Sequence, residues 1–226
     1  NPHFLFNTLN TLSAIIRIDP GEARGLVQNL STFFRKNLKR TNDIVTLSDE
    51  IEHVNAYLQI EKARFREHLQ IEIDVPEDLA QVRLPAFSLQ PLVENAIKHG
   101  TSQLIGEGRI TISAKPDGND LLISVTDNAG LFVRKQSVDG GLGMNIVDRR
   151  TKGHFGDAYG IDVKWEAEAF TTVNLRVPMG EPTHDHGHHH DGPHDHHHDH
   201  SHDDAAPARA PLRDRLKVAR LWSAAK

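Results

Sequence analysis

The first residues of the chain contain a nucleophile and a group that can orient it. The sequence opens Asn-Pro-His-Phe-Leu-Phe-Asn, in which His3 and Asn7 lie four residues apart. On a helix this spacing places both side chains on one face, so Asn7 can orient the imidazole. An imidazole with an unperturbed pKa of about 6.5 is largely neutral at pH 7 and needs little help as a nucleophile. The pair is therefore a candidate catalytic site, although a lone histidine on an apolar helix is more often structural.

A second segment, LQPLVENAIKHG at residues 89–100, supplies an amide and two basic groups. Asn95 falls in the middle of an expected helix, where a short amide does not belong unless it has a partner. Its oxygen is a hard ligand suited to Mg²⁺. Lys98, three residues on, can reach a phosphate, and His99 follows it. The alternatives are that Lys98 is simply solvated and that His99 caps the helix end.

Two glycine-containing turns and a threonine complete the set. Asp127 ends an expected strand and leads through Asn-Ala to Gly130; its carboxylate can accept protons of an adenine amino group. Gly141 and Gly143 precede an expected helix, where glycine lets the backbone approach phosphates at the positive helix end. Thr171 lies in the last expected strand. Each motif alone is weak, but in this order they supply the parts for holding Mg-ATP.

The hydrophobic pattern predicts helices first and a mixture of strands and helices afterwards, which is an α+β fold. Thr46 and Asp49, three residues apart, predict the start of the third helix. Asp117-Gly118-Asn119 predicts a hairpin. The expected helices are 1–18, 22–40, 47–67, 88–100 and 143–152, and the expected strands are 69–75, 109–115, 120–126, 160–166 and 171–178.

Composition excludes several classes of protein and divides the chain. With 38% hydrophobic residues, 25% charged residues and no cysteine, it is not collagen, a disulfide scaffold or a cysteine zinc finger. No run of 18 apolar residues exists that could span a membrane. The net charge of −5 separates into −3 for residues 1–180, −7 for residues 181–204 and +5 for residues 205–226. Residue 181 is therefore a boundary in composition.

Eleven of the 16 histidines lie between His184 and His202. We expect the acidic segment 181–204 to be disordered, because it has almost nothing apolar to bury. At this density imidazoles bind Zn²⁺ or Ni²⁺ in vitro; a solubilising linker is the alternative. Residues 205–226 form a basic tail whose apolar residues share one helical face, which suits a membrane surface, a partner or a frayed helix.

Over residues 1–180 these motifs resemble sensor histidine kinases of the LytS/YehU-like family, and most closely the YpdA- and BtsS-type branch. Asn95 matches the N box of the Bergerat (GHKL) ATP-binding fold shared with gyrase and MutL. Asp127 to Gly130 matches its first glycine box, Gly141 to Gly143 the second, and NPHFLFN the phosphoacceptor box. The resemblance to this branch is strongest in the segments FFRKNLKR, EIEHVNAYLQIEKARF and LQPLVENAIKHGTSQL.

The resemblance implies a helical dimerisation and phosphoacceptor region at 1–68 and an α/β sandwich that binds ATP at 69–180. His3 would be phosphorylated, Asn95 would hold Mg²⁺, Lys98 and His99 would lie near the phosphates, and Asp127 would bind the adenine amine. Gly141 and Gly143 would line the lid, Gly130 of the first glycine box would be among the nucleotide-binding residues, and Thr171 would approach the adenine edge.

The resemblance also implies partners and a cellular location. We expect a homodimer that passes the phosphoryl group to a response regulator, whose receiver domain is followed by a LytTR-type DNA-binding output. We expect no direct binding of nucleic acid. The chain would be a cytoplasmic fragment, and the full-length protein would lie in the bacterial inner membrane through an upstream sensor part.

Three departures from the family pattern keep alternatives open. Phe4 follows the histidine where many histidine kinases have an acid, Pro91 stands where related ATPases have a glutamate, and Ala129 and Leu131 replace two glycines of the first glycine box. Pro91 argues against a plain ATPase. Two alternative functions stay open. The chain could be a nucleotide-binding module that has lost catalysis, or a metal-binding protein that acts through its histidine-rich tail.

Overall fold

The described chain begins with two helices joined by a tight turn. The computed structural model describes residues 2–39, 43–131 and 142–180, which belong to the first of two compact units, Asn1–Glu181. Helix α1 spans Pro2–Ile15 and α2 spans Pro20–Lys39. The Asp19 side chain accepts a hydrogen bond from the Glu22 N–H at 2.8 Å, so Asp19 caps α2 and Pro20 takes its first position. Helix α2 therefore begins two residues before the predicted start.

Helix α3 (Leu47–Phe65) begins where its capping motif predicts. The Thr46 hydroxyl accepts a hydrogen bond from the Asp49 N–H at 3.2 Å. Thr46 also ends β1 (Ile44–Thr46), which pairs antiparallel with β3 (Arg83–Pro85). The sequence pattern did not predict this pair, because three residues are too few to show an alternation of period two. Short 3₁₀ turns follow α3 at Arg66–His68 and precede β3 at Glu77–Leu79.

A five-stranded sheet is the centre of the fold. Its order is β2-β4-β5-β7-β6; β2 and β4 are parallel and the other neighbours antiparallel. The predicted hairpin turn is confirmed, with Gly118 at φ 65°. The strands are β2 (Leu69–Asp74), β4 (Gly108–Asp117), β5 (Asp120–Asp127), β6 (Gly160–Glu166) and β7 (Phe170–Pro178).

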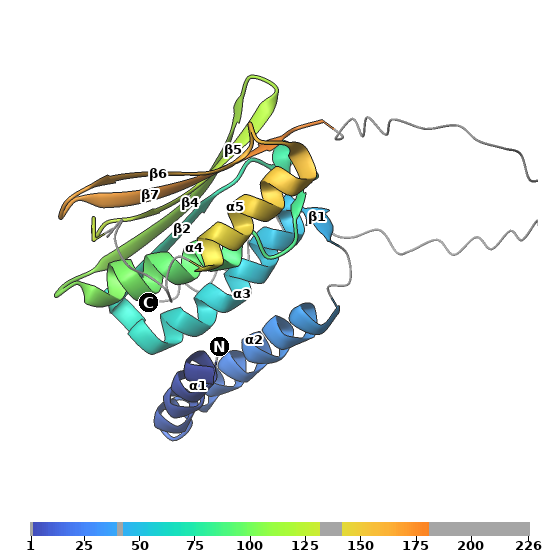
Figure 1. Cartoon of the computed structure of the whole chain (residues 1–226). Coiled ribbons are helices and arrows are strands. Elements are labelled where there is room, and N and C mark those ends of the chain that lie inside the picture. Colours follow the sequence, from blue (N-terminus) through green and yellow to red (C-terminus); the bar gives the residue numbers. More distant parts are fainter. Residues whose placement is uncertain (1, 40–42, 132–141, 181–226) are drawn as a thin grey trace, which may run out of the picture. The chain divides into compact units, whose positions relative to one another are not determined.

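Three helices cover one face of this sheet, which makes the predicted α+β sandwich (Figure 1). They are α3, α4 (Leu89–Asn95) and α5 (Leu142–Phe155). The predicted helix 88–100 is not uniform, because α4 gives way to a π-turn at Ala96–Gly100 and a 3₁₀ turn at Thr101–Gln103. π-turns occur frequently at functional sites. The core between helices and sheet includes Leu58, Leu89, Leu92, Ile110, Ile112, Leu121, Ile123 and Leu175, all completely buried.

Histidines that belong to no motif (His53, His68 and His154) are predicted to lie at the surface, and for His53 this prediction is wrong. His53 is 0% exposed. Its Nε2 lies 2.8 Å from Gln90 Oε1, and its ring stacks on Phe33 with the centroids 5.1 Å apart. The Glu50 carboxylate, one turn earlier on α3, accepts hydrogen bonds from the N–H groups of Phe87 and Leu89. Helix α3 therefore touches both α2 and the start of α4, and the domain limit at residue 68 stays a prediction.

Three of the predictions concern residues that the structure does not describe. They are the acidic segment 181–204, the basic tail 205–226 and Gly141. No helix in the described part of the chain combines the length and apolar character needed to cross a bilayer.

Asp148 fastens α5 to the edge strand β6 and carries a prediction about pH. Its carboxylate accepts hydrogen bonds from the Ile161 N–H at 2.9 Å and from Lys152 Nζ at 2.6 Å. Burial alone would raise the pKa of Asp148, but these two hydrogen bonds and the Lys152 charge outweigh it, so the pKa is lowered. The ionised form therefore stabilises the fold above the unfolded pKa of about 3.9, and this stability is lost as the pH falls through the lower folded pKa.

We expect Asp148→Asn to lower the free energy of unfolding at pH 7 by about 1 kcal/mol, because the pair is only partly screened by solvent. The difference from the wild type should disappear below about pH 4 in urea melts. Asp157→Asn, at an exposed position, is the matched control and should leave stability unchanged. A difference that persists unchanged into acid would contradict the assigned role.

Candidate active site

Asp127 and Thr171 form a polar end to an apolar sheet face. Buried side chains alternate along β5, and Asp127 continues the series after Val125. The antiparallel register sets Asp127 opposite Thr171 of β7, and the two residues are 5% and 6% exposed. The Asp127 carboxylate accepts hydrogen bonds from the Ala129 N–H at 2.9 Å and from the Thr171 hydroxyl. The structure thus brings together two residues predicted to bind adenine.

The environment of Asp127 makes it a strong acceptor that is short of donors. Burial raises the pKa of its carboxyl, and hydrogen bonds from the Ala129 and Gly130 N–H groups and from Thr171 offset that only in part. A buried carboxylate gains from every further donor supplied to it. The exocyclic amino group of a purine is such a donor.

Two glycines near Asp127 are required by close packing. A Cβ at Gly100, which ends the π-turn, would lie 2.7 Å from Asp127 Cγ. Gly130 has φ 61°, and a Cβ there would meet the Ala169 backbone nitrogen at 2.6 Å. Gly130 therefore fits against the turn between β6 and β7. The sequence assigns Gly130 to the first glycine box but gives Gly100 no role beyond ending a helix.

Asn95, Lys98 and His99 lie at the end of α4 and in its π-turn. Asn95 is half-buried, and Lys98 and His99 are exposed. Within residues 2–39, 43–131 and 142–180 the Asn95 amide and the Lys98 ammonium have no side-chain partner, which leaves both available to a ligand. Burial lowers the pKa of His99 and the neighbouring Lys98 charge lowers it further, so His99 is neutral at pH 7 and can accept a hydrogen bond.

Gly143 differs from its predicted setting. It is the second residue of α5 rather than a residue before the helix, and a Cβ there would lie 3.2 Å from Pro91 Cβ of α4. The close approach of α5 to α4 explains this glycine through packing. Pro91 stands at the position where related ATPases have a glutamate. In this chain it forms a contact with α5 instead. Gly141 lies outside the described residues.

His3 lies on the exposed side of α1, and the buried side of the same helix fixes its position. Its Nδ1 is 3.1 Å from Asn7 Nδ2, the i,i+4 contact that the spacing predicts. The adjacent residue, Phe4, is 6% exposed and packs its ring 5.3 Å from Phe33 and 5.1 Å from Tyr57. Phe4 thus fixes α1 against α2 and α3, and so fixes where His3 points.

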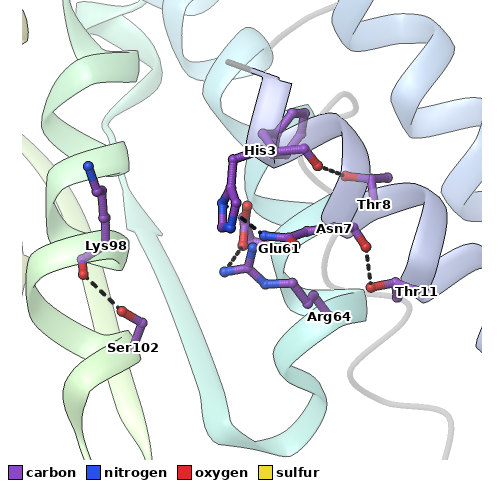
Figure 2. A network of polar contacts seen from close by, with 9 residues as sticks. His3, Asn7, Thr8, Thr11, Glu61, Arg64, Lys98 and Ser102 are labelled. Atoms are coloured by element: carbon purple, nitrogen blue, oxygen red, sulfur yellow. Dashed lines mark hydrogen bonds and ion pairs between the residues drawn. The ribbon is translucent and has the colours of Figure 1, made fainter.

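Figure 2 shows what His3 faces. The imidazole points from α1 toward an ion pair on α3, with Asn7 beside it and Lys98 on the neighbouring helix. That ion pair joins Arg64 Nη2 to Glu61 Oε2 at 2.8 Å. The sequence analysis did not single out either residue. The segment EIEHVNAYLQIEKARF contains them, but a Glu-x-x-Arg pair on a helix is ordinarily a solvated surface pair, and only the packing of α1 shows otherwise.

Part of the chain is similar in sequence to known histidine kinases. Residues 1–69 match the family model described as histidine kinase. The chain is 60% identical over 178 residues to the sensor histidine kinase BtsS of Escherichia coli K12, covering 79% of this chain and 32% of that protein. It is 46% identical over 131 residues to the sensor protein LytS of Streptococcus agalactiae, covering 57% of this chain and 22% of that protein.

The similar solved structures include the histidine kinase domain of a blue-light-activated kinase from Erythrobacter litoralis. Its TM-score is 0.47 at 16% identity, over 79% of this chain and 93% of that one. The chain spans about a third of the length of BtsS. It therefore carries a region homologous to the sensor histidine kinases of the BtsS and LytS type.

Proposed function

We propose that this chain is the kinase core of a sensor histidine kinase of a two-component system. It phosphorylates His3 with ATP and passes the phosphoryl group to an aspartate of a response regulator. The observation that carries the proposal is the position of His3, which is exposed on α1, lies 3.1 Å from Asn7 and points toward the Glu61–Arg64 pair of α3 (Figure 2). The 60% identity to BtsS supports the same activity.

Each predicted site residue has a role in this proposal. Asp127 accepts a hydrogen bond from the adenine amino group, and Thr171 keeps the carboxylate oriented. Lys98 and His99 bind phosphate oxygens, Lys98 through its charge and His99 through the N–H of a neutral imidazole. Gly130 of the first glycine box and Gly141 and Gly143 of the second bind the nucleotide through their backbone.

Asn95 is the residue that would hold Mg²⁺. The described residues contain no group of three or more His, Asp or Glu side chains that could hold a metal ion. A single amide oxygen fits Mg²⁺, which keeps several waters and takes its other ligands from phosphates. When bound, the ion neutralises charge on the transferring phosphoryl group.

Asn7 sets the imidazole of His3 for attack. Its amide can present either the NH₂ group or, after a half-turn, the oxygen to Nδ1. With the oxygen turned to the ring, Nδ1 keeps its proton and Nε2 carries the free lone pair. Nε2 then attacks the γ-phosphorus in line with the departing ADP, and catalysis comes largely from positioning.

The first two helices also support homodimerisation. They leave a series of large apolar side chains exposed, and Phe6 and Ile18 are 67% and 76% exposed. A second copy of the hairpin would cover such a surface. The exposed members are Leu5, Phe6, Leu9, Ile16, Ile18, Val27 and Phe34.

Partners and location follow from the family. We propose a response regulator with a receiver domain and a LytTR-type DNA-binding output, and no direct contact of this chain with nucleic acid. The full-length protein would be anchored in the bacterial inner membrane by a sensor part, with this region in the cytoplasm. Binding of Zn²⁺ or Ni²⁺ by the tail stays a prediction from composition alone.

The proposal is tested by incubating the chain with γ-³²P-labelled ATP and Mg²⁺. We expect label on the protein that survives alkali and is lost in acid, as a phosphorus–nitrogen bond requires. No label should appear with α-³²P-labelled ATP or when Mg²⁺ is chelated. Saturable ATP binding without label would instead identify a nucleotide-binding module that has lost catalysis, and an absence of both would leave the metal-binding tail as the function.

A further inference from the structure

Glu61 is a buried acid on the side of α3 that His3 faces. It is only 3% exposed, although it lies near the C-terminal end of α3. Arg64 lies 2.8 Å away, and Tyr57, one turn earlier, makes a side-chain hydrogen bond to the carboxylate. Burial raises the pKa of Glu61; Glu94 of α4 raises it further, while Arg64 and Tyr57 lower it in part. A group in this setting takes up protons more readily than an exposed glutamate.

The packing of α1 directs His3 to this acid. Phe4 places its ring 5.1 Å from that of Tyr57, which fixes the start of α1 against α3 one turn before Glu61. Figure 2 shows the His3 imidazole pointing toward the Glu61–Arg64 pair, and Asn7 approaches the ring at Nδ1. The groups that act on the Glu61 carboxyl are Tyr57 and Arg64 from α3 and Glu94 from α4, and His3 is directed toward it from α1.

The reaction needs a proton acceptor at this place. When one ring nitrogen bonds to phosphorus and the bond from phosphorus to the ADP oxygen breaks, the ring becomes an imidazolium. It turns into neutral phosphohistidine only when the other nitrogen releases its proton. The neighbour of His3 in the chain is Phe4, which cannot accept a proton.

We infer that Glu61 accepts this proton and that Arg64 holds the carboxylate toward His3. After Nε2 has bonded to phosphorus, the Nδ1 proton leaves its hydrogen bond to the Asn7 oxygen, the Nδ1–H bond breaks and a carboxylic O–H bond forms on Glu61; water later removes the proton. This inference rests on the proposed kinase function. In the reverse reaction, in which ADP takes the phosphoryl group back, protonated Glu61 returns the proton to the ring.

The test measures labelling rate, ATP affinity and the reverse reaction in Glu61→Gln, Glu61→Asp and the matched control Glu72→Gln, at an exposed position of β2. We expect Glu61→Gln to slow labelling by about 100-fold, as loss of general-base catalysis does. In the same variant the reverse reaction with ADP should slow equally, while the ATP affinity should stay within twofold of the wild type. Glu61→Asp should recover part of the labelling rate. Glu72→Gln should label at the wild-type rate.

A wild-type labelling rate in Glu61→Gln would overturn the inference, and so would a loss explained by weaker ATP binding. If Glu61→Gln does not fold, Tyr57→Phe decides. It removes a hydrogen bond that lowers the pKa of Glu61, so the fall of the rate toward acid should move to higher pH; an unmoved profile would reject the role. Failure of the kinase proposal looks different, because the wild-type chain itself would then remain unlabelled.

Discussion

The substitution His3→Gln should abolish phosphoryl transfer while nucleotide binding continues. Glutamine is close to histidine in size and can still hydrogen-bond Asn7, but its amide nitrogen has no lone pair free to attack phosphorus. Since Phe4, not His3, provides the buried contact of α1, the helix should stay in place. We expect labelling from γ-³²P-labelled ATP to fall at least about 1,000-fold, because covalent catalysis has no substitute for its nucleophile.

Two further substitutions show whether the effect is specific to His3. His68→Gln, at an exposed position in the turn after α3, should label at the wild-type rate. Asn7→Ala should reduce the rate by about tenfold, because the ring keeps its chemistry but loses its orienting partner. Label that survives in His3→Gln would move the phosphoacceptor elsewhere, and the exposed His99 of the π-turn would be the first position to examine.

Sequence periodicity was sufficient where the site is built by local rules. The i,i+4 spacing of His3 and Asn7 predicts their contact, and the structure has it at 3.1 Å. The sequence also places Asp127 at the end of one expected strand and Thr171 in another, and in the structure β5 and β7 set the two residues opposite each other. In both cases the two residues lie on one helix or on two neighbouring strands, so no other element decides whether they meet.

Periodicity failed where the position of a residue depends on another element. His53 looks like a surface residue on a mixed helix, but Phe33 from α2 and Gln90 from α4 enclose it. From the sequence alone, Glu61 and Arg64 look like a solvated surface pair. Only the packing of α1 against α3 shows that His3 faces them. The π-turn after Asn95 was also unforeseen, because its hydrogen bonds change without any change in which residues are apolar.

The substitution Asp127→Asn should remove most ATP affinity without unfolding the chain. The asparagine oxygen can still accept from the Ala129 N–H, but no charged acceptor remains for a purine amino group. A hydrogen bond to a charged group contributes about 1.5–3 kcal/mol, which predicts an affinity roughly tenfold to 150-fold weaker. Titration with a fluorescent ATP analogue measures this directly, with Asp120→Asn, at the far end of the same strand, as the matched control.

The stability of the same variant has a predictable dependence on pH, which separates loss of a ligand contact from loss of structure. Burial raises the pKa of Asp127 above its unfolded value, so the folded chain binds the proton more tightly and the ionised carboxylate costs stability above that pKa. Asp127→Asn removes this cost and should be at least as stable as the wild type near pH 7. As the pH falls through the raised folded pKa toward the unfolded value of about 3.9, the wild type should gain stability relative to the variant, and at lower pH the difference should stay constant. An Asp127→Asn chain that melts well below the wild type at pH 7 would show that the carboxylate supports the fold, and its weak ATP binding would then not identify an adenine contact.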